Sequence, residues 1–416
     1  MMQLQAIGPT GKYRKIICGC KLSARCKATL PAGSEVCGYG PVKTHIVLDA
    51  HMIRTVASGL DRKLLDFISD PDAGEAEFEQ LALELFAYQY SANQPYRNLC
   101  DQRNRTPELV RRWTHVPALS AASFADARIA CFPPERACLR FVSSGTTSER
   151  ERASVHELEN AVLYDASLVN HFRRCVLPDR EKIEMLLLSP SFEDAPQSSL
   201  AYMLSRLYER YASGGDFFVH HGSLDSQGIA STLRSAREPV LLFGTAFAFV
   251  HFFDYCDAAR LKFQVPPGSR IVETGGFKGK SRSIERDEFH RVLSSTFGIS
   301  PEWCISEYGM CELGSQWYDA SLSDKLAGRP PRQAFKVGPH WTRHLVVDPV
   351  SAEPLPEGSV GLLQVFDLSN RGSVAAVLTG DLVRGEGEGF TYVSRSQATP
   401  PKGCSITVDS MLRSHV

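Results

Sequence analysis

Two segments far apart in the chain carry residue types that suit a phosphate-bearing ligand. The first concentrates four hydroxyl side chains and one glycine in five residues: Ser143, Ser144, Gly145, Thr146 and Thr147. Hydroxyl groups and the backbone N–H groups of such a loop can together surround a polyphosphate. Taken alone, however, the run is more typical of a polar surface turn, because hydroxyl-rich turns are common.

The second segment, SEYGMCE at residues 306–312, combines an aromatic face, a tight turn and a carboxylate. Tyr308 supplies the aromatic ring, and Gly309 and Met310 continue the backbone beyond it. Glu312 is a hard oxygen donor of the kind that Mg²⁺ prefers. A lone glutamate is ordinarily a surface group, so the spacing by itself does not make Glu312 a metal ligand.

A glycine-rich basic segment lies between these two, with the sequence ETGGFKGKSR at residues 273–282. Its glycines allow close backbone approach, and its three cations suit a phosphate or an acyl phosphate. The residues concerned are Gly275, Gly276, Lys278, Lys280 and Arg282. Lys278 is the preferred catalytic candidate because it lies nearest the double glycine, whereas the alternative interpretation is a basic hairpin tip.

A fourth short motif, Thr379-Gly380-Asp381, follows the tyrosine motif. A carboxylate can accept hydrogen bonds from both hydroxyls of a ribose. Asp381 is therefore a candidate ribose ligand, and the alternative is an ordinary turn aspartate after Gly380.

The order of the motifs is more specific than any one of them. SSGTT, ETGGFKGKSR, SEYGMCELGSQWYD and a terminal KGCS together resemble the acyl-protein synthetase family of bacterial luminescence, within the adenylate-forming superfamily. The resemblance runs from Leu81 to Cys404. It implies that the hydroxyl loop holds the phosphates of ATP, that Tyr308 lies against adenine and that Glu312 holds Mg²⁺.

The resemblance also implies an enzyme, an acid–thiol ligase that activates a carboxylic acid, most readily a fatty acid, as an acyl adenylate. In the resembled family the acyl group then passes to a cysteine near the carboxyl terminus and on to a partner reductase. Cys404 has that position here, and the neighbouring Lys402 favours its thiolate form. Coenzyme A and a carrier protein remain alternative acceptors, and Cys404 could also be an incidental thiol.

The hydroxyl loop departs from the superfamily, which usually continues with glycine, proline and lysine. This chain continues with SERER at residues 148–152, where Arg150 or Arg152 could replace the missing lysine. Only 35 residues follow Asp381, so we expect the mobile domain that usually carries a catalytic lysine to be missing or reduced to a stub. Both departures keep open a second hypothesis, a catalytically silent nucleotide-binding scaffold.

Composition narrows the class of partner. The formal net charge is −1 over 416 residues, which gives no support for nucleic-acid binding or for a bulk membrane-surface role. The most apolar run, residues 239–253, is too short to cross a bilayer and is expected to be a buried strand entering a buried helix. Twelve cysteines without a recognisable secretory signal predict a cytoplasmic protein that binds small molecules or another protein.

Helical and strand patterns alternate along the middle of the chain. Apolar periodicity predicts helices at residues 75–89, 155–172, 199–211, 225–236, 246–260 and 285–297. Short apolar runs between them predict buried strands at residues 185–188, 240–243 and 271–272, and further strands follow at 344–348, 360–367 and 373–378. The pattern predicts an α/β adenylate-forming domain with mixed, largely parallel sheets covered by helices.

The sequence predicts four parts of the chain. Residues 1–45 form a basic, cysteine-rich extension, and its cysteine spacing fits a zinc site poorly. Residues 46–340 form the α/β core, residues 341–380 a small β subdomain, and residues 381–416 a short carboxyl-terminal stub.

Overall fold

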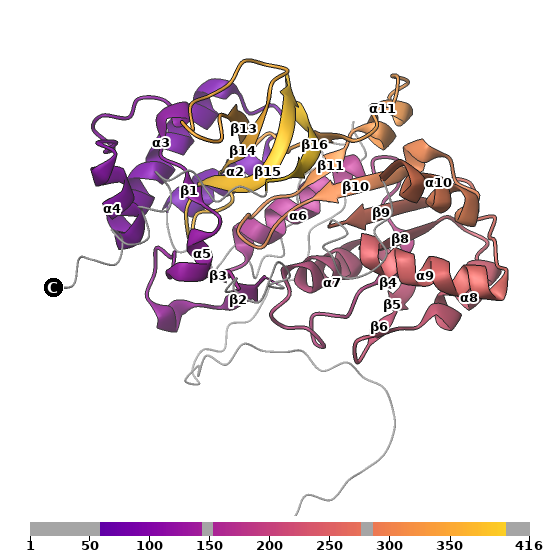
Figure 1. Ribbon diagram of the computed structural model, residues 1–416. Helices are drawn as coiled ribbons and strands as arrows, with labels where there is room; N and C mark the ends of the chain where they lie inside the picture. Colours follow the sequence, from indigo (N-terminus) through magenta and orange to yellow (C-terminus); the bar gives the residue numbers. More distant parts are fainter. Residues whose placement is uncertain (1–58, 144–152, 276–285, 397–416) are drawn as a thin grey trace, which may run out of the picture. The chain divides into compact units, whose positions relative to one another are not determined.

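The computed structural model describes residues 59–143, 153–275 and 286–396 (Figure 1). The helices are α2 (Gly59–Ser69), α3 (Glu75–Ala92), α4 (Gln94–Gln102), α5 (Ser123–Asp126), α6 (Val162–Cys175), α7 (Ser199–Tyr211), α8 (Ser226–Ser235), α9 (Ala246–Ala259), α10 (Arg286–Phe297) and α11 (Ser321–Leu326). The strands of the main sheet are β1 (Leu119–Ser120), β4 (Ile183–Leu188), β5 (Ala212–Phe217), β8 (Val240–Thr245), β9 (Arg270–Thr274), β10 (Cys304–Tyr308), β11 (Trp317–Asp319), β12 (Phe335–Val337), β13 (Thr342–Val347), β14 (Val360–Asp367), β15 (Ala376–Glu386) and β16 (Gly389–Arg395).

The main sheet changes from parallel to antiparallel along its width. Its path is β5-β4-β8-β9-β10-β11-β12-β16-β15-β14-β13, and β1 pairs with β15 outside this path. The neighbours from β5 to β10 are parallel, and those from β10 to β13 are antiparallel. Two short sheets, β2 (Leu139–Val142) with β3 (Val155–Leu158) and β6 (Val219–His220) with β7 (Ser223–Leu224), complete the described strands.

Helices cover both faces of the parallel strands. Ile271 of β9 packs into one apolar cluster with residues of α8, α9 and α10, whereas its neighbour Val272 packs into another with residues of α6 and α7. Strands buried on both faces read as continuous apolar runs, which explains the short runs recognised in the sequence. The predicted α/β class is confirmed.

A third apolar cluster covers the antiparallel strands. It joins Phe78 and Leu85 of α3 to Val365 of β14 and Val377 of β15. The predicted helix at residues 75–89 is therefore confirmed as α3, and the strands predicted at 344–348 and 360–367 are confirmed as β13 and β14. The apolar run at residues 239–253 forms β8 followed by α9, as expected.

Two local predictions differ from the structure. The helix expected from residue 155 begins only at Val162, because Val155–Leu158 pair with β2 and alternate between partial and full burial. The boundary expected between residues 380 and 381 lies inside β15, and β16 then pairs with β15 along its length. Asp381 consequently occupies a strand rather than a turn.

None of the helices in the described ranges combines the length and the apolar character that a bilayer crossing requires.

Candidate active site

Tyr308 and Asp381, which come from separate motifs, are in direct contact. Tyr308 is the last residue of β10, and its hydroxyl donates a hydrogen bond to Asp381 Oδ2 at 2.8 Å. Burial and the adjacent Asp381 carboxylate hold the pKa of Tyr308 well above its usual range, so the phenol keeps its proton and donates. The fold thus brings together two predicted nucleotide ligands that lie 73 positions apart.

The neighbouring residues restrict the ring of Tyr308 and the backbone of Asp381. The Phe390 ring meets the Tyr308 ring edge-on, with 5.4 Å between centroids. The backbone N–H of Asp381 donates to Thr379 Oγ1 at 3.2 Å, and that hydroxyl donates to the Leu363 carbonyl at 2.9 Å. A carboxylate offers about four acceptor positions, so Asp381 can accept from Tyr308 and from a ribose together.

Glu307, which precedes Tyr308 on β10, is a buried carboxyl group for which the sequence predicted no role. Its side chain is 5% exposed, and it accepts a hydrogen bond from the Thr274 hydroxyl at the end of β9. Burial raises the pKa of Glu307 to about 7. A Cβ on Gly309 would lie 2.5 Å from Glu307 Oε1, so a larger residue at this position would displace the carboxyl group.

The carboxyl ends of three adjacent parallel strands carry polar residues. Thr245 of β8 is in register with Thr274 of β9, which is in register with Glu307 of β10. Thr245 Oγ1 also accepts from the Ala248 N–H at 3.1 Å, where α9 begins. Ligands of open α/β sheets bind at such strand ends, so this edge is the candidate active site.

The glycine-rich basic motif starts at the same edge. Gly275 follows β9 directly with φ of +72°, a left-handed conformation that glycine adopts without the strain of a side chain. A Cβ built on Gly275 would meet no atom of the described residues within 4 Å. Gly276, Lys278, Lys280 and Arg282 lie outside the described residues.

The hydroxyl loop is closed at its base by two serines. Ser143 N–H donates to the Ser154 carbonyl at 3.0 Å, and Ser154 N–H donates to Ser143 Oγ at 2.9 Å. These bonds extend the antiparallel pairing of β2 and β3. Ser143 therefore has a structural bond to its oxygen and retains a hydroxyl proton to donate, whereas residues 144–147 lie outside the described part of the chain.

Glu312 lies in a buried turn after β10, with its side chain 6% exposed. No cluster of three or more potential metal-binding side chains occurs within residues 59–143, 153–275 and 286–396. Mg²⁺ bound to nucleotides nevertheless needs only one or two protein carboxylates, because phosphates and water supply its other ligands. A single buried carboxylate at Glu312 therefore fits Mg²⁺ accompanied by a triphosphate.

A buried ion pair contacts the backbone at the start of the SEYGMCE motif. Lys336 Nζ of β12 is 2.5 Å from Asp319 Oδ1 of β11 and donates to the Ser306 carbonyl at 3.0 Å. The Ser306 N–H donates in turn to Asp319 Oδ2 at 3.0 Å. The backbone N–H and carbonyl of Ser306, two residues before Tyr308, are thus both bonded to this pair. Nothing in the sequence spacing of Lys336 or Asp319 indicates that they pair with each other and hold the backbone of Ser306.

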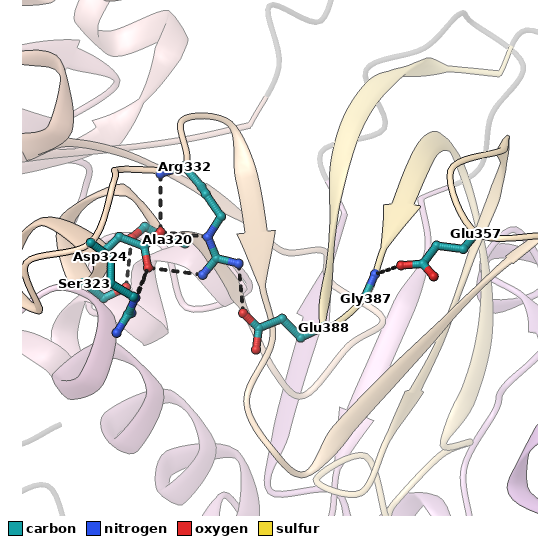
Figure 2. A network of polar contacts seen from close by, with 8 residues as sticks. Ala320, Ser323, Asp324, Arg332, Glu357, Gly387 and Glu388 are labelled. Atoms are coloured by element: carbon teal, nitrogen blue, oxygen red, sulfur yellow. Dashed lines mark hydrogen bonds and ion pairs between the residues drawn. The ribbon is translucent and has the colours of Figure 1, made fainter.

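A separate charged cleft of about 540 Å³ opens beside the turn between β15 and β16. Figure 2 shows Arg332 reaching both Asp324 and Glu388, while Glu357 accepts from the Gly387 N–H at 2.6 Å. The cleft is lined by Arg332, Gln333, Phe335, Glu357, Glu386, Gly387, Glu388 and Thr391. None of these is a predicted site residue, so the cleft does not mark the candidate active site.

Known proteins match most of the chain. A sequence profile of the family described as "Acyl-protein synthetase, LuxE" matches residues 58–412. A long-chain-fatty-acid–luciferin-component ligase of Vibrio harveyi is 24% identical over 387 residues, covering 87% of this chain and 96% of the relative. The ligase of the same name from Aliivibrio fischeri is 21% identical, covering 81% and 89%.

The fold also matches a solved structure. The crystal structure of 2-hydroxyisobutyryl-CoA ligase in a postadenylation state has a TM-score of 0.55 and 13% identity, covering 78% of this chain and 67% of that protein. At this level of identity the match concerns the fold alone, and it confirms the predicted mixed α/β fold. The expectation of largely parallel sheets was wrong, because the neighbours from β10 to β13 are all antiparallel.

Proposed function

The chain belongs to the acyl-protein synthetase family, and from that membership we propose that it uses ATP to activate a long-chain fatty acid. The carboxylate oxygen attacks the α-phosphorus of ATP and pyrophosphate leaves, which yields an acyl adenylate. A thiolate then attacks the acyl carbon and AMP leaves. The contact between Tyr308 and Asp381 carries the proposal, because it joins the residues assigned to adenine and ribose.

The other predicted residues fill the remaining roles around this contact. Ser143 with Ser144, Gly145, Thr146 and Thr147 binds the β and γ phosphates. Gly275 and Gly276 allow a close backbone approach, and Lys278 places a cation near the transferred group. Gly309 and Met310 continue the nucleotide-binding turn. Glu312 is the ligand for Mg²⁺, which would neutralise charge on the triphosphate when bound.

The test of activation is fatty-acid-dependent exchange of pyrophosphate into ATP. Glu312→Gln removes an anionic oxygen donor, so the exchange rate should fall on the order of a hundredfold or more. Glu388→Gln is the matched control, because Glu388 is exposed and lines the separate cleft. Unchanged exchange in folded Glu312→Gln would refute the assignment of Glu312. Absence of exchange in the unaltered protein would favour the silent nucleotide-binding alternative.

Cys404 is the proposed acyl acceptor, and it lies outside the described residues. Incubation of Cys404→Ala with labelled fatty acid and ATP should leave pyrophosphate exchange intact and abolish the hydroxylamine-sensitive acyl-protein. Cys138→Ala, which alters an exposed cysteine, should retain that product. Wild-type labelling of Cys404→Ala would place the acceptor elsewhere. Product formed only after addition of coenzyme A or a carrier protein would identify the alternative acceptor.

A further inference from the structure

A buried histidine connects the strand that leaves the hydroxyl loop to the turn that carries Glu312. His156 belongs to β3 and is in register with Phe141 of β2. Its side chain is 0% exposed, and its Nδ1 lies 2.8 Å from the Cys311 carbonyl oxygen. Cys311 is the residue immediately before Glu312, so this contact spans two motifs that are 155 positions apart.

The chemistry of this contact defines its direction. Burial lowers the pKa of His156 to about 4, so the ring is neutral at neutral pH and carries one proton. A carbonyl oxygen can only accept a hydrogen bond. The proton therefore lies on Nδ1 and is donated to Cys311.

A second side chain holds the next carbonyl of the same turn. Asn370 Nδ2 donates to the Glu312 carbonyl at 2.9 Å, and Asn370 Oδ1 accepts from Ser373 Oγ at 2.7 Å. Ser373 Oγ is also 3.1 Å from His156 Nε2, and its single proton is donated either to Asn370 Oδ1 or to Nε2 at any one time. Two successive carbonyls, those of Cys311 and Glu312, are thus held by one buried network that includes His156.

We propose that His156 is a positioning residue that sets the Cys311–Glu312 backbone relative to the hydroxyl-loop hairpin. The inference rests on the proposed function, in which the hairpin loop binds phosphates and Glu312 binds the accompanying Mg²⁺. A shift of the Cys311–Glu312 backbone relative to the β2–β3 hairpin would therefore change the distance between the Glu312 carboxylate and the groups that bind phosphate. Partners that orient a metal ligand typically change metal affinity 10–100-fold when they are removed.

Two substitutions separate the hydrogen bond from side-chain bulk. His156→Asn keeps an N–H group near the position of Nδ1, whereas His156→Leu retains apolar volume and removes the donor. We expect His156→Leu to need about 10–100-fold more Mg²⁺ for half-maximal pyrophosphate exchange and His156→Asn to stay within about threefold of the unaltered protein. The KM for fatty acid should not change in either variant.

Two further measurements need no turnover. Hydrogen–deuterium exchange should be faster across residues 308–316 in His156→Leu than in His156→Asn. Electron paramagnetic resonance can measure the binding of Mn²⁺ together with an α,β-methylene ATP analogue. The Mn²⁺ affinity of His156→Leu should fall by the same factor by which its Mg²⁺ requirement rises.

His171→Leu is the matched control for a general loss of stability. His171 is also a buried histidine whose ring, through Nε2, lies 3.0 Å from a backbone carbonyl, but that carbonyl belongs to Val337 of β12. The His171→Leu substitution should lower the melting temperature without changing Mn²⁺ affinity or hydrogen–deuterium exchange across residues 308–316. Equal behaviour of His156→Leu and His171→Leu in these assays would overturn the proposal.

Other outcomes distinguish the inference from the function on which it rests. If His156→Leu does not fold, Asn370→Ala can be used instead, because it removes the donor to the Glu312 carbonyl and should loosen the same turn. Unchanged hydrogen–deuterium exchange across residues 308–316 in Asn370→Ala would refute the network. An unaltered protein without fatty-acid-dependent exchange would refute the proposed function. The deuterium measurement would still test whether His156 positions the turn.

Discussion

Replacing Lys336 with methionine should lower the free energy of unfolding by about 3–5 kcal/mol. Methionine has similar length and no charge, so the substitution removes the ammonium group that lies 2.5 Å from Asp319 Oδ1. Asp319 is fully buried, and a carboxylate that loses its cation in such surroundings is strongly destabilising. The donor to the Ser306 carbonyl disappears with the same group.

The expected change in melting temperature follows from the size of the fold. Unfolding entropy is about 2.1 cal/mol/K per residue, so roughly 320 described residues correspond to about 0.7 kcal/mol/K. A loss of 3–5 kcal/mol then lowers the melting temperature by about 4–7 °C. Differential scanning calorimetry measures this shift, and urea denaturation measures the free energy directly.

A double-mutant cycle separates the ion pair from the loss of side-chain packing. Lys336→Met combined with Asp319→Leu removes both charges and should recover much of the stability lost by Lys336→Met alone. Lys325→Met is the control, because Lys325 also pairs with a carboxylate at 2.5 Å but is exposed. Exposed pairs contribute only about 0–1 kcal/mol. A Lys336→Met loss no larger than that of Lys325→Met, or a cycle without coupling, would refute the reasoning.

Two other buried charges lead to predictions. Arg371 lies between Asp61, with Nε to Oδ1 at 2.6 Å, and Glu159, with Nη1 to Oε2 at 2.7 Å, so Arg371→Met should cost about 3–5 kcal/mol in urea denaturation. A loss below 1 kcal/mol would contradict it. The pKa of Glu307 is raised from 4.5 to about 7, so the folded state binds more protons between these values and the unfolding free energy contributed by Glu307 falls as pH rises through 7. The free energy of unfolding of Glu307→Gln, measured relative to that of the unaltered protein, should therefore increase as the pH is raised from 5 to 8. If urea denaturation of the two proteins has the same pH dependence, the pKa of Glu307 is not raised.

Local pattern in the sequence predicted the elements whose burial is regular along the chain. The expected helix at residues 199–211 coincides with α7, and the apolar run at 360–367 coincides with β14. The order of the motifs also predicted the family and fold, and the candidate site residues Tyr308 and Asp381 proved to be in contact. Such signals are readable because a periodicity of 3.6 or an apolar run is contained within a few neighbouring residues.

Tertiary structure alone decided the roles of Glu307, Lys336 and His156. Burial raises the pKa of Glu307, and the buried Lys336 pairs with Asp319 because Asp319 lies on the adjacent strand. His156 stands in a short strand that pairs across the hydroxyl loop, and its partner carbonyl is 155 positions away. Hydrogen bonding and burial depend on which distant segments the sheet brings together, and no periodicity within one segment contains that information.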